Sequence, residues 1–248
     1  MSVGSKPLVS LVCPTYRRPK LAELAVRHFL AQTWQHSELI VIDDSPEGER
    51  PSIRPNARVK YVRLKDRITM GEKHNIGHAL AQGDVLGYQD DDDYWGPRRV
   101  VSQLQPIVLG EAEITGMPRH LVARIPSGTF YVFADGWWKA AANRGNTVGN
   151  WALPWHDGTA MYTRRLVGLA QHPPLNLNQK VQFLNAAMLA GKAKWKRVEN
   201  AGHFVYVRHE GSKAAPNTWQ FNEASVLKHV PAPWWFPAHV LEAWKGVA

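Results

Sequence analysis

Short apolar segments alternate with segments of helical spacing over the first ninety residues, and each apolar segment ends at polar residues. The apolar segments are 8–13, 38–43, 58–64 and 84–88. Apolar residues recur at helical spacing in 19–29, and 71–81 is also expected to form a helix. This alternation predicts an α/β fold with a mostly parallel central sheet flanked by helices. Because ligands of such sheets bind at the carboxyl ends of the strands, we expect the polar residues there to form the site.

The sequence after residue 110 has a different texture, with more Gly and Trp and with shorter apolar segments. Three alternating segments predict antiparallel strands joined by loops: 121–125, 129–133 and 159–162. No internal repeat, low-complexity tract or linker separates the two parts of the chain. We therefore expect a single domain over 1–248, with a nucleotide-binding half in 1–110 and a smaller, loop-rich half in 111–248.

Composition limits the classes of protein to which the chain can belong. The 248 residues include 30 Lys and Arg against 21 Asp and Glu, and this net charge of +9 favours polyanionic partners. No apolar run approaches the roughly 18 residues of a membrane span, and no signal-peptide pattern opens the sequence, so we expect a cytoplasmic protein. The single cysteine excludes an intrachain disulfide and a multi-cysteine metal cluster.

Four consecutive aspartates, residues 90–93, follow the fourth apolar segment. Adjacent carboxylates repel one another, so such a run beside a buried strand needs a compensating charge. A bound Mg²⁺ or Mn²⁺ supplies it, because these ions prefer oxygen ligands and bridge carboxylates to substrate phosphates. In a locally extended loop Asp90 and Asp92 point to the same side. The alternative is a solvated acidic loop that caps the next helix.

Polar residues also follow the first two apolar segments and open the second helix. Asp43 and Asp44 end the second segment, where a carboxylate accepts from a ribose hydroxyl or a base N–H, or where it simply builds a turn. Residues 14–18 offer a hydroxyl, an aromatic ring and two guanidinium groups, and the amides and lysine of 71–77 face phosphate or base. The glycine spacings of P-loop NTPases and of dinucleotide-dependent oxidoreductases are missing, so we exclude both classes.

These segments, in this order and spacing, resemble the family 2 glycosyltransferases of the GT-A fold. The resemblance lies in 12–18, 31–34, 41–45, 71–77 and 89–95. It implies a Rossmann-like GT-A domain whose second half binds the acceptor, and a donor that is a nucleoside diphosphate sugar, with a UDP-sugar as the leading candidate. The donor-binding residues implied by it are Pro14, Thr15, Tyr16, Arg18, Asp43, Asp44, Lys73, Asn75, Asp90 and Asp91.

The same resemblance implies metal-dependent transfer of the sugar to an acceptor hydroxyl, usually with inversion of the anomeric carbon. The metal, Mn²⁺ or Mg²⁺, would be held by the DXD motif of Asp90 and Asp92. A weaker match near the C-terminal end of the sequence suggests that His209 is a further metal ligand or a diphosphate contact. A structural role is the alternative for this histidine.

One departure from the family pattern concerns the general base. Inverting members usually carry a Glu-Asp pair where this sequence has Asn178, Gln179 and Lys180. The nearest replacements are His156 and Asp157, either of which would serve as a general base. The alternative is that the two residues form a turn that caps a strand. The missing pair also keeps open a non-catalytic nucleotide-sugar-binding protein. A nucleotidyltransferase is a further alternative, disfavoured by the lack of a glycine-rich phosphate loop.

Basic and aromatic residues suggest what the acceptor is. Residues 54–67 and 192–197 are rich in Lys and Arg, and four tryptophans lie at 137, 138, 151 and 155. A polyanionic acceptor such as hydroxymethylated DNA, with the modified base flipped out, would use both features. Solvated surface charge and a saccharide or other small acceptor are the alternatives.

Overall fold

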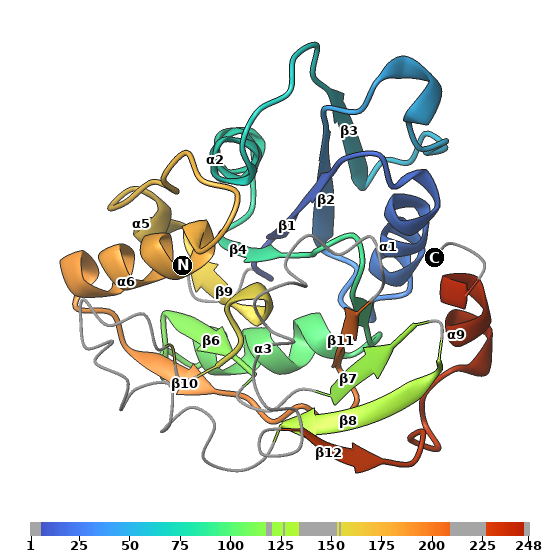
Figure 1. Cartoon of the computed structure of the whole chain (residues 1–248). Coiled ribbons are helices and arrows are strands. Elements are labelled where there is room, and N and C mark those ends of the chain that lie inside the picture. Colours follow the sequence, from blue (N-terminus) through green and yellow to red (C-terminus); the bar gives the residue numbers. More distant parts are fainter. Residues whose placement is uncertain are drawn as a thin grey trace.

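The computed structural model describes residues 6–117, 121–125, 127–133, 153, 155–208 and 227–245 of the chain. Its main sheet has the strand order β10-β6-β9-β4-β1-β2-β3 (Figure 1). The strands are β1 (Val9–Thr15), β2 (Ser37–Asp43), β3 (Val59–Arg63), β4 (Val85–Tyr88), β6 (Ile114–Gly116), β9 (Met161–Thr163) and β10 (Trp195–Arg197). β1 to β4 are mutually parallel, whereas β9 runs antiparallel to both β4 and β6.

Helices cover both faces of this sheet. Successive side chains of each strand point to opposite faces, and on β1 those of both faces are buried. Val12 of β1 packs with residues of α2 (Met70–Leu80) and α6 (Gln179–Gly191) on one face. Leu11 and Cys13 pack with α1 (Pro19–Leu30) and α3 (Arg99–Val108) on the other. The short elements α5 (Arg164–Val167), η1 (Glu47–Glu49) and η2 (Asp157–Thr159) lie in the connections.

A second sheet has the order β12-β8-β7-β11-β5. Its strands are β5 (Tyr94–Trp95), β7 (Leu121–Arg124), β8 (Thr129–Phe133), β11 (Phe204–Arg208) and β12 (Leu227–Val230). β11 pairs in parallel with β7, and the other pairs are antiparallel. The last helix, α9 (Ala238–Lys245), buries Val240 and Trp244 against the core of this sheet.

The acidic run connects the two sheets. β4 ends at Tyr88 in the main sheet and β5 begins at Tyr94 in the second, so residues 89–93 form the whole connection. The two predicted halves of the chain therefore contribute strands to both sheets. Their division into a nucleotide-binding and an acceptor-binding half stays a prediction.

The predicted α/β fold is confirmed, with a mostly parallel central sheet flanked by helices. Each predicted strand or helix named above overlaps an element of the structure, with ends that differ by one or two residues. In the part of the chain that the structure describes, no helix has the length and apolar character needed to cross a membrane. The cytoplasmic location stays a prediction.

Candidate functional site

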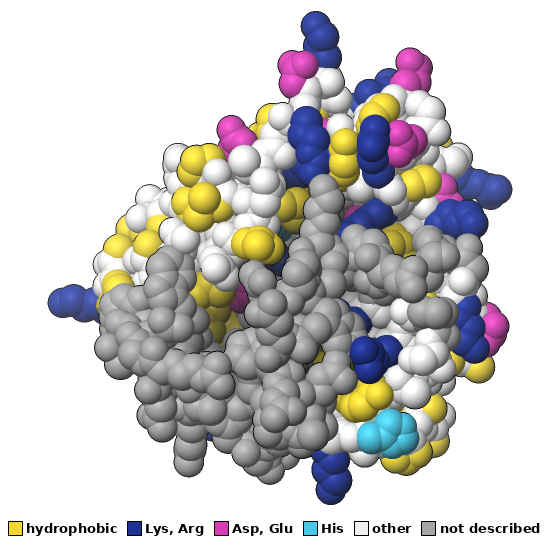
Figure 2. Space-filling view, viewed as in Figure 1, with side chains coloured by type: hydrophobic (Ala, Val, Ile, Leu, Met, Phe, Trp, Pro, Cys, Tyr) yellow, Lys and Arg dark blue, Asp and Glu magenta, His cyan; other side chains and the backbone are white. Residues whose placement is uncertain are grey.

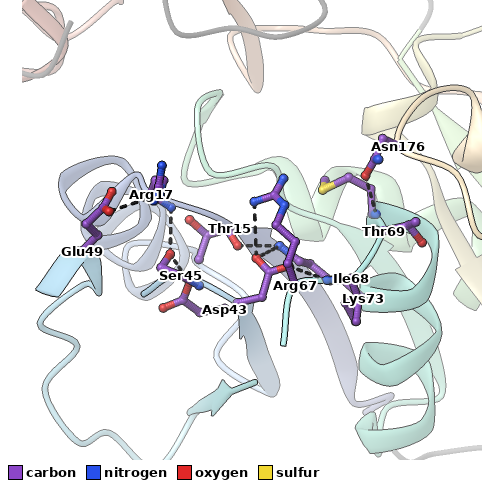
Figure 3. Close-up of polar contacts among 12 residues, drawn as sticks. Thr15, Arg17, Asp43, Ser45, Glu49, Arg67, Ile68, Thr69, Lys73 and Asn176 are labelled. Carbon is purple, nitrogen blue, oxygen red and sulfur yellow. Dashed lines mark hydrogen bonds and ion pairs between the residues drawn. The ribbon is translucent and has the colours of Figure 1, made fainter. Parts of the chain in front are cut away.

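Three neighbouring strands bring their polar ends together, as the topology predicts. β1 lies between β2 and β4, and all three run in the same direction. Their carboxyl ends carry Thr15, Asp43 with Asp44, and the acidic run. Figure 3 shows the part of this edge around Thr15, Ser45 and Lys73.

Arg18 neutralises the middle of the acidic run. It is the residue before the first turn of α1, where Pro19 supplies the fixed φ of a helix start. Its Nη1 donates to Asp91 Oδ1 at 3.1 Å and to Asp92 Oδ2 at 2.8 Å, while Thr15 Oγ1 donates to Asp91 Oδ2 at 2.7 Å. Burial opposes the charge of Arg18, but the two carboxylates outweigh it and raise the pKa of the guanidinium.

A second ion pair joins α2 to the ends of β1 and β2. Lys73 Nζ donates to Asp44 Oδ1 and, at 2.7 Å, to the carbonyl oxygen of Thr15 (Figure 3). Asp44 Oδ2 accepts from the backbone N–H of Ile68 at 3.0 Å. Burial lowers the pKa of Lys73, and Asp44 acts in the opposite direction. The start of α2 is fixed by a capping box in which the side chains of Thr69 and Glu72 each accept from the other's backbone N–H.

Tyr16 presents an aromatic face beside this pair. The guanidinium carbon of Arg67 lies 3.2 Å from the centroid of the Tyr16 ring, and Lys73 Nζ lies 5.7 Å from it. Tyr16 is half-buried and Arg67 is exposed. An aromatic ring with cations at its edge and face is suited to a nucleotide base and its phosphates.

Both carboxylate oxygens of Asp43 accept hydrogen bonds from neighbouring residues of the fold. Its Oδ1 accepts from the backbone and hydroxyl of Ser45, at 2.9 and 2.5 Å, and its Oδ2 accepts from the Tyr61 hydroxyl at 2.7 Å. The side chain is buried and builds the turn after β2. Its contact with a nucleotide stays a prediction.

Lys180 lies against the first residue of the acidic run. Its Nζ donates to Asp90 Oδ1 at 2.6 Å and Oδ2 at 2.5 Å, and its side chain is 7% exposed. Burial opposes the ammonium charge, but Asp90 and then Asp157 raise the pKa of Lys180. Asn178, just before α6, has a φ of 61°, a left-handed conformation that only a few non-glycine residues adopt. In the sequence, Lys180 only marks a position where relatives usually carry an acid, and nothing there predicts its pairing with Asp90.

The last acid of the run is held by the second sheet. Asp93 Oδ1 accepts from the backbone N–H of Val207 in β11 at 3.0 Å, and Oδ2 lies buried with no hydrogen-bond partner among the residues that the structure describes. Burial, and then the neighbouring Asp92 and Asp90, raises the pKa of Asp93 well above its usual value. Asp93 therefore anchors the loop to β11 through the hydrogen bond with Val207.

His156 and Asp157, the predicted general bases, lie next to Asp90. They sit at the start of η2, and a Cβ on the following residue, Gly158, would lie 3.0 Å from Asp90 Oδ2. The His156 ring packs on Phe204, and burial lowers its pKa. The Asp157 side chain is 33% exposed, with Oδ1 3.9 Å from His156 Nε2. The structure thus brings both residues to the acidic run, and their catalytic role stays a prediction.

The remaining predicted residues lie further out or outside the described residues. Pro14 is buried within β1, opposite Ile42 of β2. The Asn75 side chain pairs with the backbone of His172, donating to its carbonyl at 2.9 Å and accepting from its N–H at 2.9 Å. His209 and the tryptophans at 137, 138 and 151 fall outside the described residues.

The donor set fits a hard divalent cation. Asp90 and Asp92 offer carboxylate oxygens, each on a side chain 19% exposed, and both already face a side-chain cation. No group of three or more His, Cys, Asp or Glu is arranged around a common metal position within the described part of the chain. Mg²⁺ and Mn²⁺ sites often use one or two carboxylates and complete their shell with water and substrate phosphates.

Comparisons with known proteins point to one family. The family model described as Glycosyl transferase family 2 matches residues 10–165. TuaG of Bacillus subtilis (strain 168), named as a teichuronic acid biosynthesis glycosyltransferase, is 25% identical over 252 residues, which cover 97% of each chain. Glycosyltransferase GlyG of Streptococcus pneumoniae is 24% identical over 134 residues, and these cover 52% of this chain and 44% of GlyG.

Two solved structures share the fold. S. aureus TarS 1–349 in complex with UDP-GlcNAc has a TM-score of 0.57 and 15% identity, over 82% of this chain and 59% of that one. The mannosyltransferase PcManGT from Pyrobaculum calidifontis, in complex with GDP-Man and Mn²⁺, has a TM-score of 0.58 and 16% identity, over 85% of this chain and 59% of that one. This chain therefore spans about three fifths of each structure.

Proposed function

Since the chain belongs to glycosyl transferase family 2, a family of transferase enzymes, we propose that it moves a sugar from a nucleoside diphosphate donor to an acceptor hydroxyl, with inversion of the anomeric carbon. The observation that carries this proposal is the cluster of ion pairs at the carboxyl ends of β1, β2 and β4. Cations and carboxylates alternate there around Thr15. A nucleoside diphosphate needs both kinds of group.

The donor is assigned to the residues around Tyr16 and Thr15. The Tyr16 ring supplies a face for the base, and Asp44 supplies a carboxylate for a base N–H or a ribose hydroxyl. Lys73 and Arg18 place positive charge beside the diphosphate. A UDP-sugar is the first donor to test, because a neighbour of the same fold is solved with UDP-GlcNAc.

Asp90 and Asp92 would hold Mn²⁺ or Mg²⁺, in line with the Mn²⁺ that the PcManGT structure contains. When bound, such an ion stabilises the negative charge that grows on the leaving diphosphate. Asp157 is the candidate general base, because its carboxylate is partly exposed next to Asp90. His156, whose pKa burial lowers, is the second candidate for the same role.

The proposed acceptor is a polyanion such as hydroxymethylated DNA. Lys and Arg side chains stand among acidic and apolar ones over the upper part of the face shown in Figure 2. Exposed basic residues also follow α6 and form β10 around Trp195, whose side chain is 47% exposed. Such surfaces bind phosphate backbones, with an affinity that falls as salt rises. A saccharide or other small acceptor is the second candidate, favoured by the names of the curated relatives.

The experiment is a transfer assay with UDP-sugars, Mn²⁺ and two kinds of acceptor. Mass spectrometry follows the acceptor, and nucleotide analysis follows the donor. Release of a nucleoside diphosphate with sugar on the acceptor supports the proposal, whereas release of pyrophosphate indicates a nucleotidyltransferase. Asp90→Asn should abolish transfer, and Asp66→Asn, an exposed acid, should not. Donor binding without any transfer or hydrolysis would leave only the non-catalytic alternative.

Comparison of the acceptors decides between their classes. Transfer to hydroxymethylated DNA that weakens steeply with salt supports the polyanion. Transfer to saccharides alone, or DNA binding insensitive to salt, refutes it.

A further inference from the structure

The ammonium group of Lys180 pairs with the first carboxylate of the acidic run, Asp90. It reaches Asp90 from helix α6, ninety positions later in the sequence, and donates to both carboxylate oxygens. No salt bridge joins Lys180 to any other acid in the described part of the chain, and its side chain is 7% exposed. The pair therefore lies largely out of water, where the attraction between the charges is strongly felt.

A divalent cation bound at Asp90 would be repelled by the ammonium group of Lys180. Both oxygens of the carboxylate already accept from Lys180, and an ion placed within coordination distance of them would lie close to a like charge. Arg18 donates to one oxygen of Asp92 and to one oxygen of Asp91. Without a donor, two side-chain cations therefore already pair with three acids of the run, and an added ion would lie close to like charges.

Resting on the function proposed above, we propose that Lys180 competes with the divalent cation for Asp90. The donor-free protein then binds the ion weakly, and the diphosphate, which brings negative charge, makes the ion and the ammonium compatible. The four-carbon stem of lysine allows this shift. The Tyr88 ring, 4.9 Å from Nζ, offers the ammonium a second favourable contact. Lys180 is thus a positioning residue that makes metal and donor bind together.

Mn²⁺ binding measured by electron paramagnetic resonance tests this directly, without any turnover. Lys180→Met should raise the affinity for Mn²⁺ in the absence of nucleotide by about tenfold or more, the lower end of the coupling between close charge pairs. UDP should raise the Mn²⁺ affinity of the unaltered protein by a larger factor than that of the variant. Lys180→Arg, which keeps the charge, should bind Mn²⁺ weakly. Lys192→Met, at the exposed other end of α6, is the matched control.

Lys180→Gln carries the same expectation as the methionine variant and keeps a donor to Asp90, in case the loss of the ammonium prevents folding. Unchanged or weaker Mn²⁺ binding in these variants overturns the inference, as does a UDP effect of equal size with and without Lys180. The proposed function is tested by a different result, the transfer of sugar. A protein with the expected Mn²⁺ response but no sugar transfer would refute the proposed reaction and leave the role of Lys180 standing.

Discussion

Three buried histidines should make the protein sensitive to mild acid. His74 and His78 lie on α2, and His172 lies in the segment before α6. The ring centroids of His74 and His172 are 4.9 Å apart, and those of His78 and His172 are 4.8 Å apart. Burial lowers the pKa of His78 to about 3 and of His172 to about 2, and it takes the pKa of His74 well below its ordinary value.

The sign and size of the effect follow from these shifts. An unfolded histidine titrates near about pH 6.5, so below that pH the unfolded chain binds protons that the folded protein does not. The free energy of unfolding is therefore highest above about pH 6.5 and falls as the pH drops toward the folded pKa values. Each of these histidines lowers the free energy of unfolding by about 1.4 kcal/mol per pH unit below about pH 6.5. At about pH 5.5 the three together therefore lower it by about 4 kcal/mol. That is a large part of an ordinary stability of about 5–15 kcal/mol.

Urea unfolding followed by tryptophan fluorescence at about pH 7.5, 6.5 and 5.5 measures this loss. His74→Leu is the informative variant, because neither ring nitrogen of His74 has a hydrogen-bond partner among the described residues. It should be as stable as the unaltered protein near neutral pH and should lose about 1.4 kcal/mol less stability by about pH 5.5. His36→Leu, at an exposed position, should leave the pH dependence unchanged. A stability that does not vary over this range, or an equal slope in both variants, would refute the reasoning.

The remaining predictions concern the supports of the site, and unfolding in urea measures each. A Cβ on Gly71 would lie 1.8 Å from the carbonyl oxygen of Pro173, so Gly71→Ala should cost about 1–3 kcal/mol, and Gly48→Ala, with open space around it, should cost little. Thr69→Ala breaks the capping box and should cost about 1 kcal/mol, whereas equal stability would show that the cap is dispensable. Lys73→Met leaves Asp44 buried without its cation and should cost about 3–5 kcal/mol; a smaller loss than that of Thr69→Ala would contradict this view of the pair.

The periodicity of apolar residues was sufficient to predict the helices and strands that pack against the core along their whole length. β1, β2 and α1 were predictable because their apolar spacing is a local property of the sequence. β5 and β6 were not, since strands of two and three residues show no period and exist through their partners. Tyr94 of β5, for example, pairs with Val205, more than a hundred positions away.

The site, too, was only partly predictable from the sequence. That the acidic run needs a compensating charge follows from its residues, but the sequence suggests a metal and gives no sign that Lys180 lies beside Asp90. One signal was available: a lysine at the start of a helix that is otherwise apolar or neutral has few other partners nearby. The histidine cluster also left a trace, because His74 and His78 are four apart and share one face of α2.

The connection of the two sheets through residues 89–93 has a consequence for the order of events during folding. The acids are made early, but β11, which anchors Asp93, and Lys180, which neutralises Asp90, are made in the last third of synthesis. Contacts so distant in sequence form slowly. A nascent chain that stops at residue 165 holds the complete family match yet keeps its acidic run partly unanchored. The acidic run therefore gains its last partners late, after β11 has been synthesised.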